Sequence, residues 1–169
     1  NEVGAGPNLF RRTDGAWERE MIADGWEWTR VSLADLDGDG RQEIVLSEGD
    51  RPYQDDAPGR VGWYDAAAGS LTVLEDDLFC PHSLQVADFT GDGRPDIYIA
   101  EMGLGENDES AQHVLFHNRG GGEFREEIVE TAIPTHEAKA VDVDGDGRID
   151  VIGKSFEPNV HVDVWYNRP

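Results

Sequence analysis

Asp35-Leu-Asp-Gly-Asp-Gly-Arg-Gln-Glu43 is the first of three copies of one nine-residue stretch. The others are Asp88-Phe-Thr-Gly-Asp-Gly-Arg-Pro-Asp96 and Asp142-Val-Asp-Gly-Asp-Gly-Arg-Ile-Asp150. Oxygen-bearing side chains stand at positions 1, 3, 5 and 9 of each copy, and calcium takes about six to eight oxygen ligands. The two glycines allow positive φ, so that mutually repelling carboxylates can wrap around one ion. We therefore expect a calcium loop at each copy.

An EF-hand is the nearest alternative, but its loop closes with a Glu at position 12 and lies between two helices. Position 12 here is Leu46, Ile99 or Gly153, and none of these binds a metal through its side chain. Each copy is followed by a short β-branched run, such as Glu43-Ile-Val-Leu-Ser47. Such runs are typical of strands in a buried sheet. The loops are therefore expected in β-hairpins.

Composition excludes several classes of partner. The 169 residues carry a formal net charge of −22, whereas binding to nucleic acid or to an anionic membrane needs a basic surface. No apolar run is long enough to insert into a membrane, and the length suits one domain with a substantial core. Cys80 is the single cysteine, so no internal disulfide is possible and cysteine usage indicates no compartment.

The expected location follows from the start of the chain and from the loops. The sequence begins at Asn1 without a methionine, which indicates a processed or trimmed product whose signal peptide, if any, has been removed. Weak, exposed calcium loops suit the millimolar calcium found outside cells. We therefore expect a secreted or cell-surface protein.

The loops define an internal repeat of about fifty residues, within the range of propeller blades. The loop starts are 53 and 54 positions apart. One domain, residues 1–169, is divided into units at 1–28 (partial), 29–81, 82–135 and 136–169. Each complete unit is expected to have four strands. First strands are expected at 29–34, 82–87 and 136–141, second strands after each loop, and third and fourth strands at 60–64 and 70–74 and at 114–118 and 123–129.

The sequence therefore predicts an all-β fold built from propeller blades of four antiparallel strands. Residues 8–15 and 17–22 resemble only a third and fourth strand, and residues 162–166 only a third. About three blades are too few for a ring, because propellers have about four to eight. We expect an open arc, a homo-oligomer that completes the ring, or a piece of a larger propeller. The first strand pair could also complete the sheet begun by the last strands.

The thrice-repeated motif and the β-run behind it resemble the FG-GAP/VCBS repeats of integrin-α-like β-propellers. Ala57-Pro-Gly-Arg-Val-Gly-Trp-Tyr64 is similar to the Gly-Ala-Pro and Gly-x-Val-x-x-Tyr part of that repeat. The resemblance covers nearly the whole chain. It implies a propeller that binds up to three calcium ions through side chains at positions 1, 3, 5 and 9 and a backbone carbonyl at position 7.

The implied ligands follow from the three copies of the motif. They are Asp35, Asp37, Asp39, Arg41 and Glu43 in the first loop, Asp88, Thr90, Asp92, Arg94 and Asp96 in the second, and Asp142, Asp144, Asp146, Arg148 and Asp150 in the third, each Arg through its backbone oxygen. Thr90 replaces a carboxylate, so the second site should be the weakest. Glu43 is longer than Asp, which alters the geometry of the first.

A second group of polar residues is expected on the opposite face, about 20 Å from the loops. His82 and His136 each stand six residues before a loop, and Glu48, Glu101 and Lys154 end the second strands on that face. His and Glu together can hold a transition metal or act as acid and base, and Lys can stabilise an oxyanion. The candidate catalytic residues are His82, His136, Glu101 and Lys154. The alternative is that these are polar strand ends that bind water.

The remaining aromatic and histidine residues give weaker indications. Trp26 and Trp28 are placed to form a platform for a carbohydrate, whereas Trp63 and Trp165 are expected at matching third-strand positions that pack between blades. Trp17 is expected in the core. Three further histidines are expected on exposed strand surfaces: His113, His117 and His161.

Two functions remain open from the sequence. The first is a calcium-stabilised module that recognises a carbohydrate or a protein. The second is a metal-assisted sugar lyase or dehydratase, because the spacing of His82 and His136 resembles that of FG-GAP-type propellers among such enzymes, whose histidine-rich central faces hold metal and substrate. A third possibility is that the chain is only an assembly unit of a larger propeller. The long acidic loops at residues 50–59 and 102–112 are expected to be solvated connections, and such loops commonly carry recognition.

Overall fold

The computed structural model describes residues 6–27, 29–53, 56–105, 108–156 and 160–168. Within these ranges the protein is all-β, apart from one turn of 3₁₀-helix, η1, at Asp108–Ser110. No helix among them is long and apolar enough to cross a membrane. The predicted all-β class is therefore confirmed.

The described strands all pair in antiparallel fashion with strands next to them in the sequence. They are β1 (Asn8–Thr13), β2 (Ala16–Met21), β3 (Thr29–Ala34), β4 (Glu43–Glu48), β5 (Gly59–Asp65), β6 (Ser70–Leu78), β7 (Ser83–Ala87), β8 (Asp96–Ala100), β9 (Gln112–Gly120), β10 (Glu123–Thr131), β11 (Glu137–Val141), β12 (Asp150–Lys154) and β13 (Val162–Trp165).

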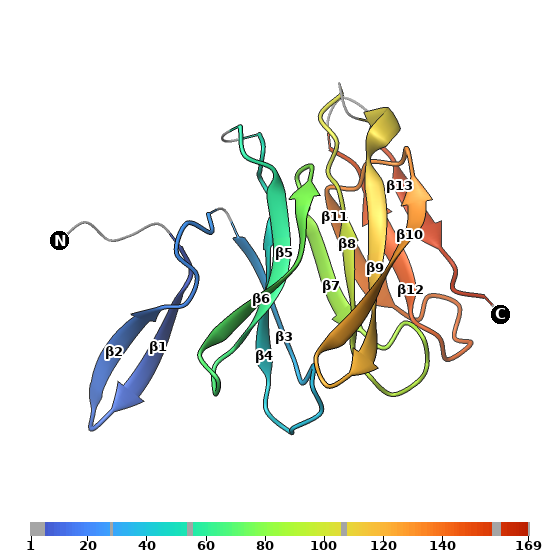
Figure 1. Ribbon diagram of the computed structural model, residues 1–169. Coiled ribbons are helices and arrows are strands. Elements are labelled where there is room, and N and C mark those ends of the chain that lie inside the picture. The colour runs from blue at the N-terminus through green and yellow to red at the C-terminus, as the bar shows by residue number, and fades with distance from the viewer. Residues whose placement is uncertain (1–5, 28, 54–55, 106–107, 157–159, 169) are drawn as a thin grey trace.

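These strands form four sheets, each made of consecutive strands. β1 and β2 form the N-terminal hairpin, β3–β6 the first sheet, β7–β10 the second sheet and β11–β13 the third sheet. The sheets stand side by side in chain order, with the N-terminal hairpin at one end and the third sheet at the other (Figure 1). β7 lies beside both β3 and β11, so the strands that lead into the loops are neighbours.

Apolar side chains fill the spaces between neighbouring sheets. Leu36 of the first loop and Trp63 of the first sheet pack with Ile97 and Phe116 of the second sheet in one cluster. The second and third sheets share another cluster, to which Trp165 contributes. Each fully buried large apolar side chain contributes about 1.5–3 kcal/mol relative to exposure. The sheets are therefore stabilised by their contact with one another.

The predicted strands are confirmed with small shifts. Residues 29–34 form β3 as expected, whereas β7 and β11 begin one residue late, at Ser83 and Glu137. The fourth strands are longer than expected and run to Leu78 and Thr131. The two acidic connections lie between β4 and β5 and between β8 and β9, where the sequence predicts them.

The N-terminal hairpin does not complete the last sheet, contrary to one of the expectations. β1 and β2 pair only with each other among the described strands, and β13 is an edge strand at the far end of the row (Figure 1). The hairpin lies beside the first sheet, where the Tyr64 hydroxyl donates to the Glu20 carboxylate at 3.2 Å. Only a short segment, residues 22–28, joins the hairpin to β3, and this tether keeps it there.

Trp63 and Trp165 pack between sheets as predicted, but their positions do not match. Trp165 pairs with Val151 on β12, whereas Trp63 pairs with Val45 on β4. The register places Tyr64, not Trp63, at the position equivalent to Trp165. A shift of one residue turns a strand side chain to the opposite face. The two tryptophans therefore pack against the second sheet from its two sides.

Candidate metal loops and the histidine cluster

The first residue of each loop binds the backbone of its own loop in the same way. One carboxylate oxygen accepts the amide at position 4, at 2.8 Å in Asp35 and 2.7 Å in both Asp88 and Asp142. The other oxygen accepts the amide at position 6, at 2.9, 2.8 and 2.9 Å respectively. The glycines at these positions all have φ between 72° and 88°. This left-handed backbone carries little cost in glycine and gives the three loops one shape.

Positions 5 and 7 form a pair in every loop. The position 7 amide donates to the position 5 carboxylate, at 2.8 Å between Arg41 and Asp39 and at 2.9 Å between Arg148 and Asp146. The Arg41 guanidinium also contacts the Asp39 carboxylate, while that of Arg148 lies 4.0 Å from Asp146. Exposed pairs of this kind contribute little stability, so a cation can replace the guanidinium as partner of the position 5 carboxylate.

The last residue of each loop is a buried carboxylate. Glu43, Asp96 and Asp150 are each at most 2% exposed. One oxygen of each accepts the amide at position 2, which is the Leu36 amide for Glu43, at 2.7 Å. Burial, and then the charges of the neighbouring loop aspartates, raise the pKa of Glu43. Amide hydrogen bonds, first that of Asn167, lower the pKa of Asp150.

Two of the loops gather acidic oxygens closely enough to share one ion. Carboxylate oxygens of Asp35, Asp37 and Asp39 lie within 4.8 Å of one another, and so do those of Asp142, Asp144 and Asp150. Within the described part of the chain, the second loop, where Thr90 replaces a carboxylate, forms no such group. Clustered oxygens on a tight loop are the donors that a hard cation uses. The residues present therefore fit calcium at the first and third loops best.

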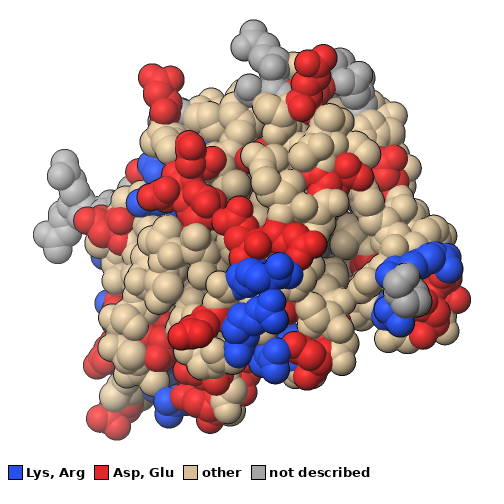
Figure 2. Space-filling view, turned by 45° about the vertical axis from the view of Figure 1, so that its right-hand side comes forward, with Lys and Arg blue, Asp and Glu red and all other residues tan. Residues whose placement is uncertain are grey.

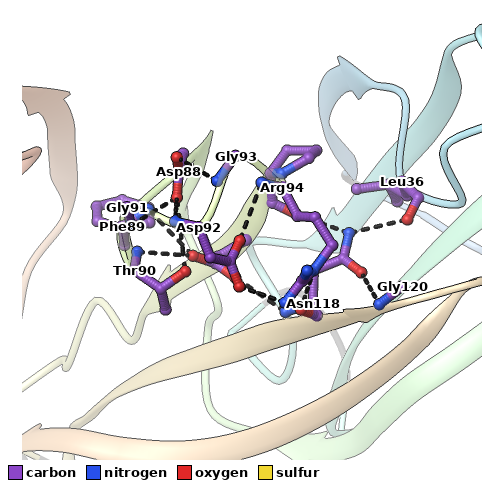
Figure 3. A network of polar contacts seen from close by, with 12 residues as sticks. Leu36, Asp88, Phe89, Thr90, Gly91, Asp92, Gly93, Arg94, Asn118 and Gly120 are labelled. Atoms are coloured by element: carbon purple, nitrogen blue, oxygen red, sulfur yellow. Dashed lines mark hydrogen bonds and ion pairs between the residues drawn. The ribbon is translucent and has the colours of Figure 1, made fainter.

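Asn118, at the end of the third strand of the second sheet, joins two loops. Its amide donates to Asp96 at 2.9 Å, and its side-chain amide donates to the Leu36 carbonyl at 2.8 Å and to the Pro95 carbonyl at 3.0 Å (Figure 3). Leu36 belongs to the first loop, whereas Asp96 and Pro95 belong to the second. One buried side chain thus holds neighbouring loops in a fixed arrangement.

Asn167 repeats this arrangement one sheet further on. Its amide donates to Asp150 at 2.8 Å, and its side chain donates to the Phe89 carbonyl at 2.7 Å and the Ile149 carbonyl at 3.3 Å. Neither asparagine could be predicted from the sequence, because their partners are far apart in the chain. The available signal was an Asn-Arg pair near the end of the third strand in both units, at residues 118–119 within β9 and at residues 167–168 just after β13.

The predicted histidine cluster forms at the ends of β3, β7 and β11 that lie away from the loops. The rings of His82 and His136 stack with centroids 4.1 Å apart. The His82 Nδ1 lies 2.6 Å from the His136 carbonyl, which can only accept, so Nδ1 donates and Nε2 accepts from the Arg30 guanidinium. Asp50 lies 3.4 Å from the same guanidinium. Burial, and then the Arg30 charge, lower the pKa of His82 to about 4.

Lys154 joins the cluster, as expected. Its Nζ lies 3.2 Å from the His136 Nδ1, and the Phe156 ring stands 5.0 Å from the His136 ring. Burial and then the Lys154 charge lower the pKa of His136. Each ring therefore directs a nitrogen to a different cation.

The two glutamates expected in this cluster lie in buried networks of their own. Glu48 is fully buried and binds Arg60 at 2.6 Å and Arg51 at 2.9 Å. The two oxygens of Glu101 accept the amides of Phe79 at 2.7 Å and Gln112 at 2.9 Å. Burial raises the pKa of Glu101. The structure thus brings His82, His136 and Lys154 together and uses both glutamates to fix the connections between strands.

His113 is buried, contrary to the prediction of an exposed surface. It is 1% exposed, its Nε2 donates to the Ile133 carbonyl at 2.8 Å, and its Nδ1 accepts from the Tyr98 hydroxyl at 2.8 Å. It faces the third sheet, where its ring meets the edge of Trp165. His117 and His161 are partly exposed and pair with Glu127 and Asp163.

Two tryptophan predictions are wrong. Trp17 is 68% exposed on β2, which pairs only with β1 among the described strands. Trp26 is 3% exposed and lies under the Arg60 guanidinium at 4.7 Å, so its ring offers no open platform for a sugar. Trp28 lies outside the described residues.

Comparison with known proteins agrees with the repeat seen in the loops. Residues 88–153 match the family model of an FG-GAP-like repeat. This span begins at the first residue of the second loop and ends on β12, directly after the third loop. No curated protein matches the chain. The similarity to an FG-GAP-like repeat is thus found at residues 88–153.

Proposed function

We propose that the chain is a calcium-binding β-propeller module that recognises a carbohydrate or a protein. The observation that carries the proposal is the common shape of the three loops, in which the carboxylates of positions 1 and 9 are held by backbone amides. Loops of the same geometry at one end of neighbouring sheets are expected each to bind the same kind of ligand. Calcium is the cation that such oxygen donors suit best.

Electrostatics support a stabilising role for the ion. The chain carries a formal charge of −22, and acidic side chains are spread over the visible surface with Lys and Arg confined to a few groups (Figure 2). Crowded carboxylates repel one another when no cation is bound. An ion that binds only the folded chain shifts the folding equilibrium towards it. The millimolar calcium outside cells would suffice for weak sites, in line with the proposed secreted or cell-surface location.

Recognition is proposed at the end of the sheets opposite the loops. The histidine cluster there offers partly exposed cationic groups on Arg30 and Lys154, whose side chains are 35% and 48% exposed. Phe156 adds an aromatic side chain that is 46% exposed. Cationic donors beside an aromatic ring can bind either a sugar or a protein segment.

A metal-dependent sugar lyase or dehydratase is the second candidate, because His82, His136 and Lys154 do gather as that reading requires. Two observations make us favour recognition. The accepting nitrogen of His82 already receives the Arg30 guanidinium, and Glu101 is buried with both oxygens on backbone amides. If the module only recognises its ligand, His136→Ala should weaken binding of a sugar, and neither the wild type nor the variant should show catalytic turnover. Turnover of a uronic-acid polymer by the wild type that disappears in His136→Ala would favour the enzyme.

The calcium proposal is tested by metal analysis and thermal unfolding. After dialysis against calcium with trace zinc, manganese and iron, the protein should retain up to three calcium ions, and chelation should lower the unfolding temperature. Asp144→Ala removes one carboxylate of the third loop and should lower the calcium content by one ion. Asp76→Ala, which removes the same charge from exposed β6, is the control and should leave the content unchanged. Retention of no calcium by the wild type would refute the proposal.

A further inference from the structure

The first and second sheets turn the same set of positions towards the sheet that follows each of them. In the first sheet these positions are buried against the second sheet. They are Ala34, Leu36, Val45, Val61 and Trp63, each at most 9% exposed. The second sheet presents Phe89 and Tyr98 at equivalent positions to the third sheet, in the second apolar cluster. The contact between sheets is therefore a repeated interface formed by equivalent positions.

The third sheet keeps this set apolar although no described segment covers it. The register establishes the correspondence, since Ile152 pairs with Val164 as Val45 pairs with Trp63. We call these residues the outer face of the third sheet; they are Val141, Val143, Ile152, Val162 and Val164. Val162 is 67% exposed, and Val141, Val143 and Val164 are between 37% and 43% exposed. Lys139 and Lys154 lie on the same face, opposite Ile152 and Val162. Scattered exposed valines are ordinary, but apolar residues at all five interface positions indicate a partner.

The opposite end of the row carries the complementary surface. Val31 and Leu33 on β3 are 59% and 54% exposed. Their equivalents on β7, Leu84 and Val86, pack against the preceding sheet in the first apolar cluster. We call Val31 and Leu33 the open β3 face. The N-terminal hairpin and Trp26 cover only the neighbouring strands of the first sheet, which leaves this inner strand uncovered.

We propose that a second copy of the chain covers the outer face of the third sheet with its own open β3 face. The contact reproduces the interface that already joins the first sheet to the second and the second to the third. It is heterologous, because two different surfaces of the chain meet, and such contacts give rings or open filaments according to the rotation between copies. This inference goes beyond the proposed function and does not depend on what the module recognises.

The net charge opposes this association, so the apolar contact must exceed the repulsion between two chains of −22 each. Salt at physiological strength screens exposed charges beyond about 8 Å, whereas the contact between apolar faces is unaffected. Association should therefore be measured at that ionic strength and in the presence of calcium throughout, so that loop charge is constant among variants.

Sedimentation equilibrium tests the proposal. The mass of the wild type should rise above that of one chain as its concentration increases. Val164→Asp in the outer face and Leu33→Asp in the open β3 face should each lower the association constant at least tenfold. Ile128→Asp, at a 52% exposed position on β10 of the second sheet and outside both faces, is the matched control and should associate like the wild type. Circular dichroism shows that each variant is folded.

Mixing the two variants distinguishes this contact from a symmetric one. Val164→Asp keeps an intact open β3 face and Leu33→Asp keeps an intact outer face, so an equimolar mixture should form pairs of one copy of each and nothing larger. A wild type that stays monomeric at all concentrations would overturn the proposal. So would an assembly that Leu33→Asp leaves unchanged, because that would place the outer faces of two copies against each other.

Discussion

Asn118 binds two loops through one buried side chain, so a change confined to its amide is expected to be costly. Asn118→Asp keeps the shape of the side chain but removes both donors and places a carboxylate against the carbonyls of Leu36 and Pro95. Leaving buried acceptors without donors costs about 1–3 kcal/mol each. The free energy of unfolding in urea should fall by about 2–6 kcal/mol. Asn118→Ala, which adds no charge, should lose most of the same amount, and a loss below about 0.5 kcal/mol in both would contradict the assignment.

His82 should make stability depend on pH. Its pKa in the folded protein is lowered from its ordinary value to about 4 by burial and by the Arg30 charge, so the unfolded chain takes up the proton first. The contribution is fully present above about pH 6.5 and is lost as the pH falls to about 4, by an amount on the order of 3 kcal/mol. The free energy of unfolding, measured in urea at several pH values across this range, should change less steeply with pH in His82→Gln than in the wild type. Buried His113 is present in both proteins and largely cancels, so equal slopes would contradict the prediction.

At the scale of elements, the turn between β9 and β10 packs against the neighbouring sheet through one glycine. A Cβ on Gly122 would lie 2.9 Å from the Trp63 ring, whereas a Cβ on Gly121 would meet no other group within 4 Å. Both glycines have positive φ, at 78° and 63°. Each Ala substitution should therefore cost about 1 kcal/mol for the backbone, and only Gly122→Ala should cost more through the displaced ring. Equal unfolding temperatures for the two variants would contradict this packing argument.

Elements whose signal is local could be predicted, whereas those decided by distant partners could not. The glycines of the loops and the β-branched runs behind them predict three hairpins, and β3, β4, β7 and β8 stand where expected. As a polar residue, His113 is expected on the surface from the sequence alone. In the structure it is buried, and Tyr98 and the Ile133 carbonyl form hydrogen bonds with its two ring nitrogens. The mismatch of Trp63 and Trp165 arises because a one-residue difference in register is not visible from motif spacing alone.

At the scale of the whole molecule, the excess of negative charge should make stability depend on ionic strength. With calcium removed by chelation, the acidic side chains behind the net charge of −22 repel one another across a compact fold. Salt screens that repulsion. The unfolding temperature should rise by several degrees between low and physiological ionic strength. Tetramethylammonium chloride should match sodium chloride, because screening does not depend on the identity of the cation. An unfolding temperature that rises with sodium alone would point instead to sodium bound in the loops.

Every sheet consists of strands that follow one another in the chain, and this order has a consequence for synthesis on the ribosome. The first sheet is complete once residue 78 has emerged, yet Val45 and Trp63 stay uncovered until the second sheet forms. Local contacts form early, whereas docking of one sheet on another waits for the next unit. Stalled nascent chains should therefore acquire protease resistance in steps, with residues 29–78 protected only after β10 has left the exit tunnel. Each sheet of the growing polypeptide would thus reach its final packing only after the next unit had been synthesised.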